Sequence, residues 1–247
     1  MDKFGEMFPK PYKAAPALSV AQMIEVDRLA VERFGVTLLQ MMENAGRSLA
    51  VLARQEFLKG RCAGRSVVVL VGKDGNGGGA LSAARRLFAW GATVRVVLSH
   101  PIAELSPATA HQVKTLQEMG LVMLFETVTG ADLILDGLVG YRLKGHPYGR
   151  TAELIAWTNR QITPVLSLDL PSGLHGDTGV PAEPCIRASA TCTLALPKQG
   201  LLTPKARPMV GELFLADIGV PRVLYQSPSI GLEVGPIFSD SDIVKVR

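Results

Sequence analysis

The segment from Ser66 to Leu87 constrains the fold most, because strand, turn and helix signals follow one another in it without interruption. Residues 67–71 are all valine or leucine, a run typical of a strand buried on both faces of a parallel sheet. Five of the next eight residues are glycine, and apolar residues from Leu81 onward repeat at helical spacing. We expect an anion site here, because free N–H groups at a helix start suit a phosphate. The alternative is a tight turn that binds no ligand. The run matches neither the GxGxxG nor the P-loop pattern, so it indicates a phosphate or nucleotide without indicating which one.

Composition places the chain among ordinary globular proteins and narrows its partners. The 247 residues are 47% hydrophobic and 19% charged, with a net charge of +4 and no basic cluster, which argues against nucleic acid. The three cysteines lack metal-site spacing and indicate a reducing compartment, so we expect a cytoplasmic protein. We find no apolar run that could span a membrane and no signal core in residues 1–18, which we expect to form a flexible leader.

Helix and strand signals alternate along the chain and predict an α/β fold. Two helices should precede the glycine run, at 20–34 with Ser19 as N-cap and at 37–58, where Glu43 and Asn44 are interpreted as a solvated turn. Later strands are predicted at 93–98, 122–125, 132–138, 163–168 and 191–196, and a strand at the edge of the sheet is predicted at 211–216. Further helices are predicted to start at 81 and to cover 106–119 and 151–161. This alternation implies a mostly parallel sheet between two layers of helices.

Polar residues follow several of these strands, and the carboxyl ends of parallel strands share one edge, where ligands bind. Asp169 ends a strand before Pro171; it is interpreted as a general acid/base or a ribose ligand, with an Asx turn or cap as the alternative. Asp136 could hold a hard cation together with the neutral oxygens of Asn76 and Ser172. Lys198 either balances a substrate phosphate or is an exposed lysine without a role.

Read in order, these motifs resemble one known family. They are Met42–Gly46 (MENAG), Val71–Gly72 with the run 75–78, Leu135–Asp136, Asp169–Gly173 (DLPSG), and 193–198 followed by Gly200 and Leu201. As a set, they are similar to the NAD(P)H-hydrate epimerase family, also called the YjeF N-terminal domain, over residues 19–221. Residues 222–247 are expected to form a C-terminal tail.

The resemblance implies a Rossmann-like three-layer α/β/α fold and a homodimer. It implies an isomerase that interconverts the R and S forms of hydrated NADH and NADPH (NADHX and NADPHX), which carry a hydroxyl at nicotinamide C6. A partner dehydratase then consumes the S form. By similarity, Asp169 is the acid/base candidate and K⁺ is held by Asn76, Asp136 and Ser172. The residues implied to contact the substrate are Gly75, Asn76, Gly77, Gly78, Gly79, Gly140, Tyr141, Arg142, Leu143, Lys144, Gly145, His146 and Asp169.

The sequence also departs from the family pattern. Gly75 and Gly79 stand where the family loop carries asparagine and aspartate, and Tyr141 and Arg142 replace small residues beside the expected site. A catalytically impaired nucleotide-binding or dimeric interaction module is therefore an alternative hypothesis. A nucleotide-dependent dehydrogenase is a third, which the missing GxGxxG and the lack of an acidic residue after the second strand disfavour.

Overall fold

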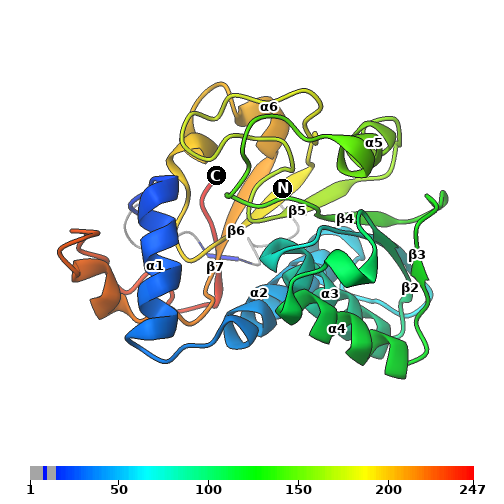
Figure 1. Cartoon of the computed structure of the whole chain (residues 1–247), viewed down its shortest axis with the longest axis horizontal. Helices are drawn as coiled ribbons and strands as arrows, with labels where there is room; N and C mark the ends of the chain where they lie inside the picture. The colour runs from blue at the N-terminus through cyan, green and yellow to red at the C-terminus, as the bar shows by residue number, and fades with distance from the viewer. Residues whose placement is uncertain (1–7, 10–14) are drawn as a thin grey trace, which may run out of the picture.

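The computed structural model describes residues 8–9 and 15–247, and a β-sheet lies at its centre (Figure 1). This sheet has eight strands. The strand order is β3-β2-β1-β4-β5-β6-β7-β8; the first seven strands run parallel, and β8 is antiparallel to β7. The strands are β1 Ser66–Val71, β2 Thr93–Leu98, β3 Met123–Leu124, β4 Leu133–Gly137, β5 Val165–Leu168, β6 Ala190–Leu194, β7 Glu212–Ala216 and β8 Ile243–Lys245. The predicted, mostly parallel sheet is confirmed.

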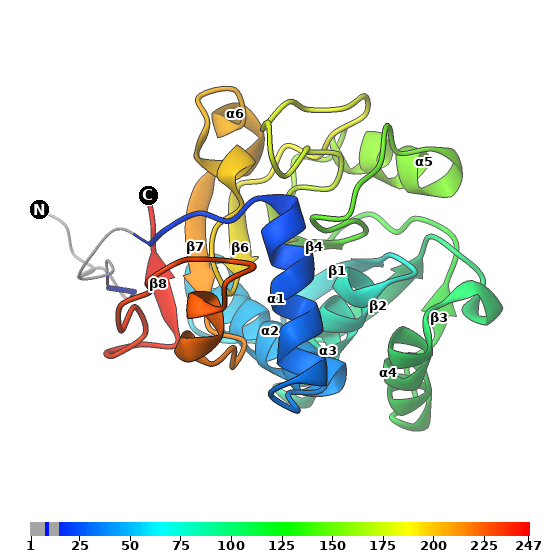
Figure 2. The same ribbon diagram turned by 60° about the vertical axis from the view of Figure 1, so that its left-hand side comes forward.

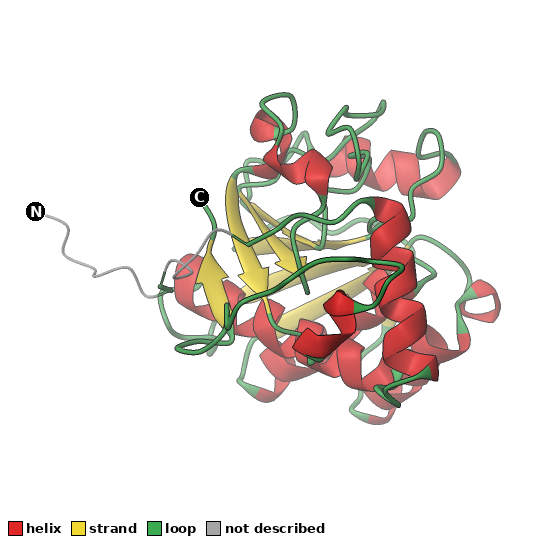
Figure 3. Ribbon diagram, turned by 90° about the vertical axis from the view of Figure 1, so that its left-hand side faces the viewer, coloured by secondary structure: helices red, strands yellow, loops and turns green. Residues whose placement is uncertain are grey.

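Helices cover both faces of this sheet and complete the predicted three layers (Figure 3). Val67, Val69 and Val71 of β1 pack in one cluster with apolar residues of the helices α2 and α3, whereas Val68 and Leu70 pack in another with residues of α5. The predicted burial of β1 on both faces is therefore confirmed. The helices are α1 Val20–Glu32, α2 Leu38–Leu52, α3 Gly75–Ala89, α4 Pro107–Glu118, α5 Gly149–Thr158 and α6 Arg207–Val210.

Capping explains where the two N-terminal helices begin. Ser19 and Thr37 each accept the backbone N–H of a glutamine three residues later, and that glutamine side chain accepts the cap's own N–H, a reciprocal capping box. The predicted N-cap at Ser19 is thus confirmed. The second helix continues past Leu52 as a π-helical turn, η1 Ala53–Phe57; the short 3₁₀ segments are η2 Ile102–Glu104, η3 Gln199–Leu202 and η4 Arg222–Gln226.

One prediction about the edge of the sheet and one about the first residue of a helix are wrong. The strand at 212–216 is not at the edge, because β8 of the C-terminal segment pairs with it (Figure 2). Helix α3 begins at Gly75 rather than near Leu81, so the glycine run forms its first turn instead of a loop. Intrinsic propensity disfavours glycine in helices, and the close packing of Gly77 and Gly78 against neighbouring atoms overrides it.

The interpretation of Glu43 and Asn44 as a solvated turn is also wrong. Both side chains are half-buried: Glu43 accepts hydrogen bonds from Arg85, Arg86 and Gln112, and Asn44 donates to the Ile218 carbonyl at 3.2 Å. The pair therefore ties α2 to α3, α4 and the segment after β7.

Most of the predicted leader, residues 1–7 and 10–14, lies outside the described residues. In its described part, Phe8 packs edge-on against Phe214 and Leu18 is fully buried beside Lys198. Across the described residues, we find no helix long and apolar enough to cross a membrane.

Candidate functional site

A cleft of about 650 Å³ opens at the carboxyl ends of β1, β4 and β5. The strand order reverses here, since β1 lies between β2 and β4, and such switch points are where open parallel sheets bind ligands. Its volume is typical of small-molecule sites. The walls come from α1, α2, the start of α3, residues 138–148 and the segments that follow β5 and β6. The expected convergence of strand ends is confirmed.

Asp169 lies in this cleft directly after β5. Its backbone is in the left-handed region, with φ 66°, and its N–H donates to the Cys192 carbonyl of β6 at 2.8 Å. The residue is only 3% exposed. Its Oδ2 accepts the Tyr141 backbone N–H at 3.1 Å, and its Oδ1 accepts a hydrogen bond from the Lys198 ammonium. A non-glycine residue at positive φ is uncommon, and such strained backbone clusters at functional sites.

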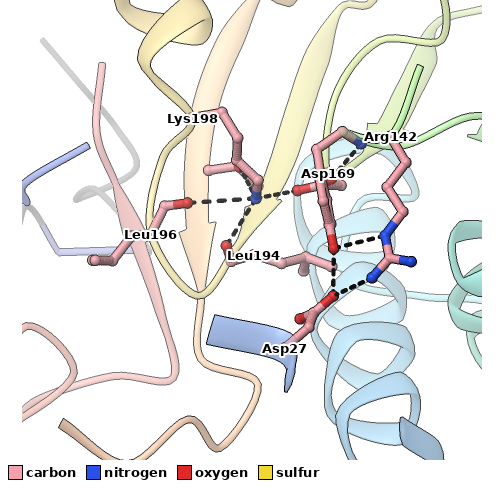
Figure 4. A network of polar contacts seen from close by, with 8 residues as sticks. Asp27, Arg142, Asp169, Leu194, Leu196 and Lys198 are labelled. Carbon is pink, nitrogen blue, oxygen red and sulfur yellow. Dashed lines mark hydrogen bonds and ion pairs between the residues drawn. The ribbon is translucent and has the colours of Figure 1, made fainter. Parts of the chain in front are cut away.

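Lys198 is the cation of this pair (Figure 4). Its side chain is fully buried. Besides Asp169, its Nζ donates to the carbonyls of Leu194 at 3.0 Å and Leu196 at 3.4 Å, and to the Thr193 hydroxyl at 3.4 Å. A buried ammonium is costly unless it is paired and hydrogen-bonded, and here it is both. The alternative that Lys198 is an exposed lysine is therefore wrong.

The segment 139–142 passes over Asp169, and Gly140 leaves room for that passage. A Cβ at Gly140 would lie 3.1 Å from the Asp169 Oδ2 and 3.2 Å from the Asn76 Oδ1. Val139 N–H, one residue earlier, donates to the Ser172 hydroxyl at 2.8 Å. The oxygens of Asn76 and Asp169 therefore face the same small space beside Gly140.

Asp136 lies beneath this space, fully buried within β4. Its carboxylate accepts hydrogen bonds from the Ser172 hydroxyl at 2.6 Å, the Ser172 N–H at 2.9 Å, the Ser167 hydroxyl at 2.8 Å and the Leu138 N–H at 3.2 Å. Burial raises the pKa of Asp136, and these hydrogen bonds oppose the rise only in part. The structure thus brings Asp136 and Ser172 into direct contact.

The glycine run divides into two groups. Gly75, Asn76 and Gly79 line the cleft. A Cβ on Gly77 would lie 2.0 Å from the Gly72 carbonyl oxygen, and one on Gly78 would lie 2.7 Å from the sulfur of Met42. These two glycines let α3 pack against its neighbours, so packing accounts for part of the glycine excess that the sequence attributed to a ligand.

The second predicted contact segment, 140–146, forms one side of the cleft. Within it, Gly140, Tyr141, Arg142, Leu143, Lys144 and His146 line the cleft, and Gly145 makes the turn at φ 67°. Arg142, Lys144 and Lys73 line the cleft and are exposed, as is Asp74, so three cations and one carboxylate lie at its mouth and the balance of charge there suits an anionic ligand.

Sequence reasoning missed several residues of the cleft, namely Asp27, Lys73, His100 and Tyr148. Asp27 is the most telling, because a lone aspartate on the predicted first helix carries no local signal of a site. His100 follows β2, and its Nδ1 lies 2.8 Å from the Ser99 hydroxyl; only its place after a strand could have indicated it.

Fold and site together define a class: a Rossmann-like α/β protein with a buried Asp–Lys pair in a nucleotide-sized cleft at the switch point of its sheet. The family model of the YjeF-related protein N-terminus matches residues 38–200. This protein belongs to that family, and the resemblance drawn from the sequence motifs is confirmed.

Named relatives agree with this assignment. The chain is 44% identical to the NAD(P)H-hydrate epimerase of Dehalogenimonas lykanthroporepellens over 86% of both chains, and 38% identical to that of Truepera radiovictrix over 87% of this chain and 94% of the relative. It is 34% identical to the bifunctional NAD(P)H-hydrate repair enzyme Nnr of Moorella thermoacetica, matching 84% of this chain but 41% of that enzyme. A crystal structure of the yeast protein ynu0 superimposes with a TM-score of 0.79 at 25% identity, covering 93% of this chain and 99% of the yeast chain.

Proposed function

We propose that this protein is an NAD(P)H-hydrate epimerase, an isomerase that interconverts the R and S forms of hydrated NADH and NADPH. The observation that carries the proposal is Asp169, held in the cleft by Lys198 and the Tyr141 N–H in a chain whose relatives bear this name. The carboxylate is oriented from two sides, as a proton-transfer group must be.

The chemistry needs little more than one such group. The substrate carries a hydroxyl on nicotinamide C6, beside the ring nitrogen, and inversion at C6 requires one bond to open and close again. In one route the C6–OH proton is removed, the C6–N bond breaks and the nitrogen is protonated, and the same steps in reverse close the ring. In the other route the hydroxyl is protonated and leaves as water, and water then adds to the opposite face of C6 with loss of a proton. Both routes are redox-neutral and return every proton, so Asp169 can serve as acid and base, contributing roughly 10²–10⁴-fold.

The positions of charge suggest how the dinucleotide lies. We place the hydrated nicotinamide at Asp169 and the diphosphate toward the first turn of α3, whose N–H groups lack partners within the helix. Exposed Lys73, Arg142 and Lys144 at the mouth favour the same orientation. The contacts assigned to 75–79 and 140–146 are part of this proposal, and within these two segments Gly77, Gly78 and Gly145 do not line the cleft.

We further propose that K⁺ binds at Asn76, Asp136 and Ser172. The donor set consists of oxygens, the ligands that hard cations take, and the Asn76 Oδ1 faces the small space beside Gly140, 3.2 Å from where a Cβ on that glycine would lie. Asn76 would present its oxygen to the ion, while Asp136 fixes the Ser172 hydroxyl. The ion supplies positive charge beside the substrate site.

The positions that motivated the binding-module alternative do not close the cleft. The centre of the Tyr141 ring lies 5.8 Å from the Lys198 Nζ, and its hydroxyl donates to Asp27 in the wall of the cleft. Gly79 leaves space against Leu168 of β5, where an added Cβ would lie 2.8 Å from that side chain. No observation favours that alternative or the dehydrogenase.

The remaining assignments are proposals drawn from the family resemblance and, for the location and the absence of a nucleic-acid partner, from the composition. They are a cytoplasmic homodimer, an S-specific dehydratase as functional partner, and no nucleic-acid partner. The bifunctional relatives support the dehydratase, since this chain matches less than half of their length. Exposed apolar residues on α1 and α2 support a subunit contact; they are Ile24, Val31, Leu38 and Leu39.

A coupled assay tests the activity. A mixed R/S preparation of hydrated NADH is supplied to an S-specific dehydratase with its nucleotide cosubstrate, which stalls when the S form is spent. Adding this protein should drive rapid consumption of the remainder, whereas Asp169→Asn should lower the rate roughly 10²–10⁴-fold. Decay of the remainder at the spontaneous rate with the wild-type protein would overturn the proposal.

A further inference from the structure

Asp27 of α1 is a carboxylate in the cleft to which the proposed chemistry gives no part. Its side chain is 22% exposed and faces the guanidinium of Arg142 (Figure 4). It also accepts a hydrogen bond from the hydroxyl of Tyr141. Burial raises the pKa of Asp27, and the hydrogen bond from Tyr141 opposes that rise. A half-buried acid at this position needs an explanation, because desolvating a carboxylate is unfavourable unless its partners compensate.

Tyr141 connects Asp27 to the proposed acid/base. Its backbone N–H donates to the Oδ2 of Asp169 at 3.1 Å, and its side-chain hydroxyl donates to the Oδ2 of Asp27. The Arg142 Nε donates to the same hydroxyl at 2.9 Å, and its Nη2 lies 3.4 Å from Asp27. One residue therefore holds Asp169 with its main chain and α1 with its side chain.

The segment 139–142 depends on such contacts for its position. It lies outside the helices and strands, with Gly140 inside it and Gly145 shortly after it. One end is fixed where Val139 donates to the Ser172 hydroxyl, and the other where Tyr141 reaches Asp27. Loss of the second anchor leaves the Tyr141 N–H free to move away from Asp169.

We propose that Asp27 is a positioning residue for Asp169, acting through Tyr141 to hold the segment 139–142 over the carboxylate. This inference rests on the proposed epimerase function and adds to it a residue on an N-terminal helix that precedes the whole sheet. A displacement of about 1 Å at a reacting group costs up to roughly 10²-fold in rate. We therefore expect loss of this anchor to lower kcat roughly 10–100-fold while KM changes less than about threefold.

The test compares Asp27→Ala, Tyr141→Phe and their double variant in the coupled epimerase assay. Because both changes break the same link, the double variant should be no slower than the slower single variant, a strong non-additivity. Tyr141→Phe keeps the ring over Lys198 and removes only the hydroxyl, so it decides the question even if Asp27→Ala fails to fold. The matched control is Glu25→Ala on the same helix, whose carboxylate pairs with Arg28 and the Ser229 hydroxyl at the surface. We expect the control to retain kcat within about twofold.

The outcomes separate this inference from the function on which it rests. A wild-type protein without epimerase activity overturns the proposed function itself. If the wild type is active and Tyr141→Phe keeps the wild-type kcat, only the role of Asp27 is overturned. The same holds if the losses in kcat of the two single variants multiply in the double variant, or if the variants change only KM.

Discussion

Replacing Lys198 by methionine tests the charge pair at the centre of the cleft. Methionine keeps an unbranched apolar chain that matches the aliphatic part of lysine, but it removes the ammonium that donates to Asp169, Leu194 and Leu196. The Asp169 carboxylate, 3% exposed, then stays buried with the Tyr141 N–H as its remaining donor within the described part of the chain. Breaking a buried pair from one side costs about 3–5 kcal/mol, because an uncompensated charge is left behind.

We therefore expect Lys198→Met to lower the free energy of unfolding by about 3–5 kcal/mol and Tm by roughly 6–20 °C for a domain of this size. Urea denaturation followed by circular dichroism measures the change. Adding Asp169→Asn should recover at least half of the loss, since the stranded charge is then gone. The control is Lys144→Met at an exposed lysine of the same cleft, expected within about 0.5 kcal/mol of wild type. A loss below about 1 kcal/mol for Lys198→Met would refute the reasoning.

Two further predictions concern the first turn of α3. Gly77→Ala should lower the free energy of unfolding by about 1–3 kcal/mol or more, because its Cβ would lie 2.0 Å from the Gly72 carbonyl oxygen. Gly75→Ala should be neutral or stabilising, because the nearest atom to its Cβ would lie 3.7 Å away. Equal effects of the two variants in urea denaturation would contradict this reasoning. If K⁺ binds as proposed, KCl should raise the unfolding midpoint above that in choline chloride of equal ionic strength, and Asn76→Ala should abolish the difference. An identical midpoint in both salts would remove the K⁺ proposal while leaving the fold and the Asp–Lys pair untouched.

The sheet could be predicted because each strand is a local signal. The apolar run at 93–98 coincides with β2, and the run at 67–71 lies within β1. Once the sheet is parallel, topology alone brings Asp169 and the start of α3 to one edge. The edge of the sheet was predicted wrongly because β8 is only three residues long and pairs with a partner nearly thirty residues earlier in the chain.

The site was predicted less completely because its decisive contacts are long-range. Burial of Lys198 depends on carbonyls presented by the chain turning back after β6, which no spacing in the sequence reveals. Asp27 reaches Tyr141 across 114 positions, and only the docking of α1 against the cleft creates that contact. The glycines at 77 and 78 resembled ligand contacts, yet a glycine required by a neighbouring backbone or side chain gives the same sequence signal as one required by a phosphate.

The central claim is that Asp169 in this cleft inverts C6 of the hydrated nicotinamide. The most direct measurement begins with a single chromatographically isolated epimer of hydrated NADH and follows the appearance of the other epimer by the same separation, without a coupling enzyme. We predict that the wild-type protein brings the mixture to its equilibrium ratio well ahead of the spontaneous reaction, and that Asp169→Asn does so roughly 10²–10⁴-fold more slowly. Interconversion at the spontaneous rate with the wild-type protein, or at the wild-type rate with Asp169→Asn, would contradict the account.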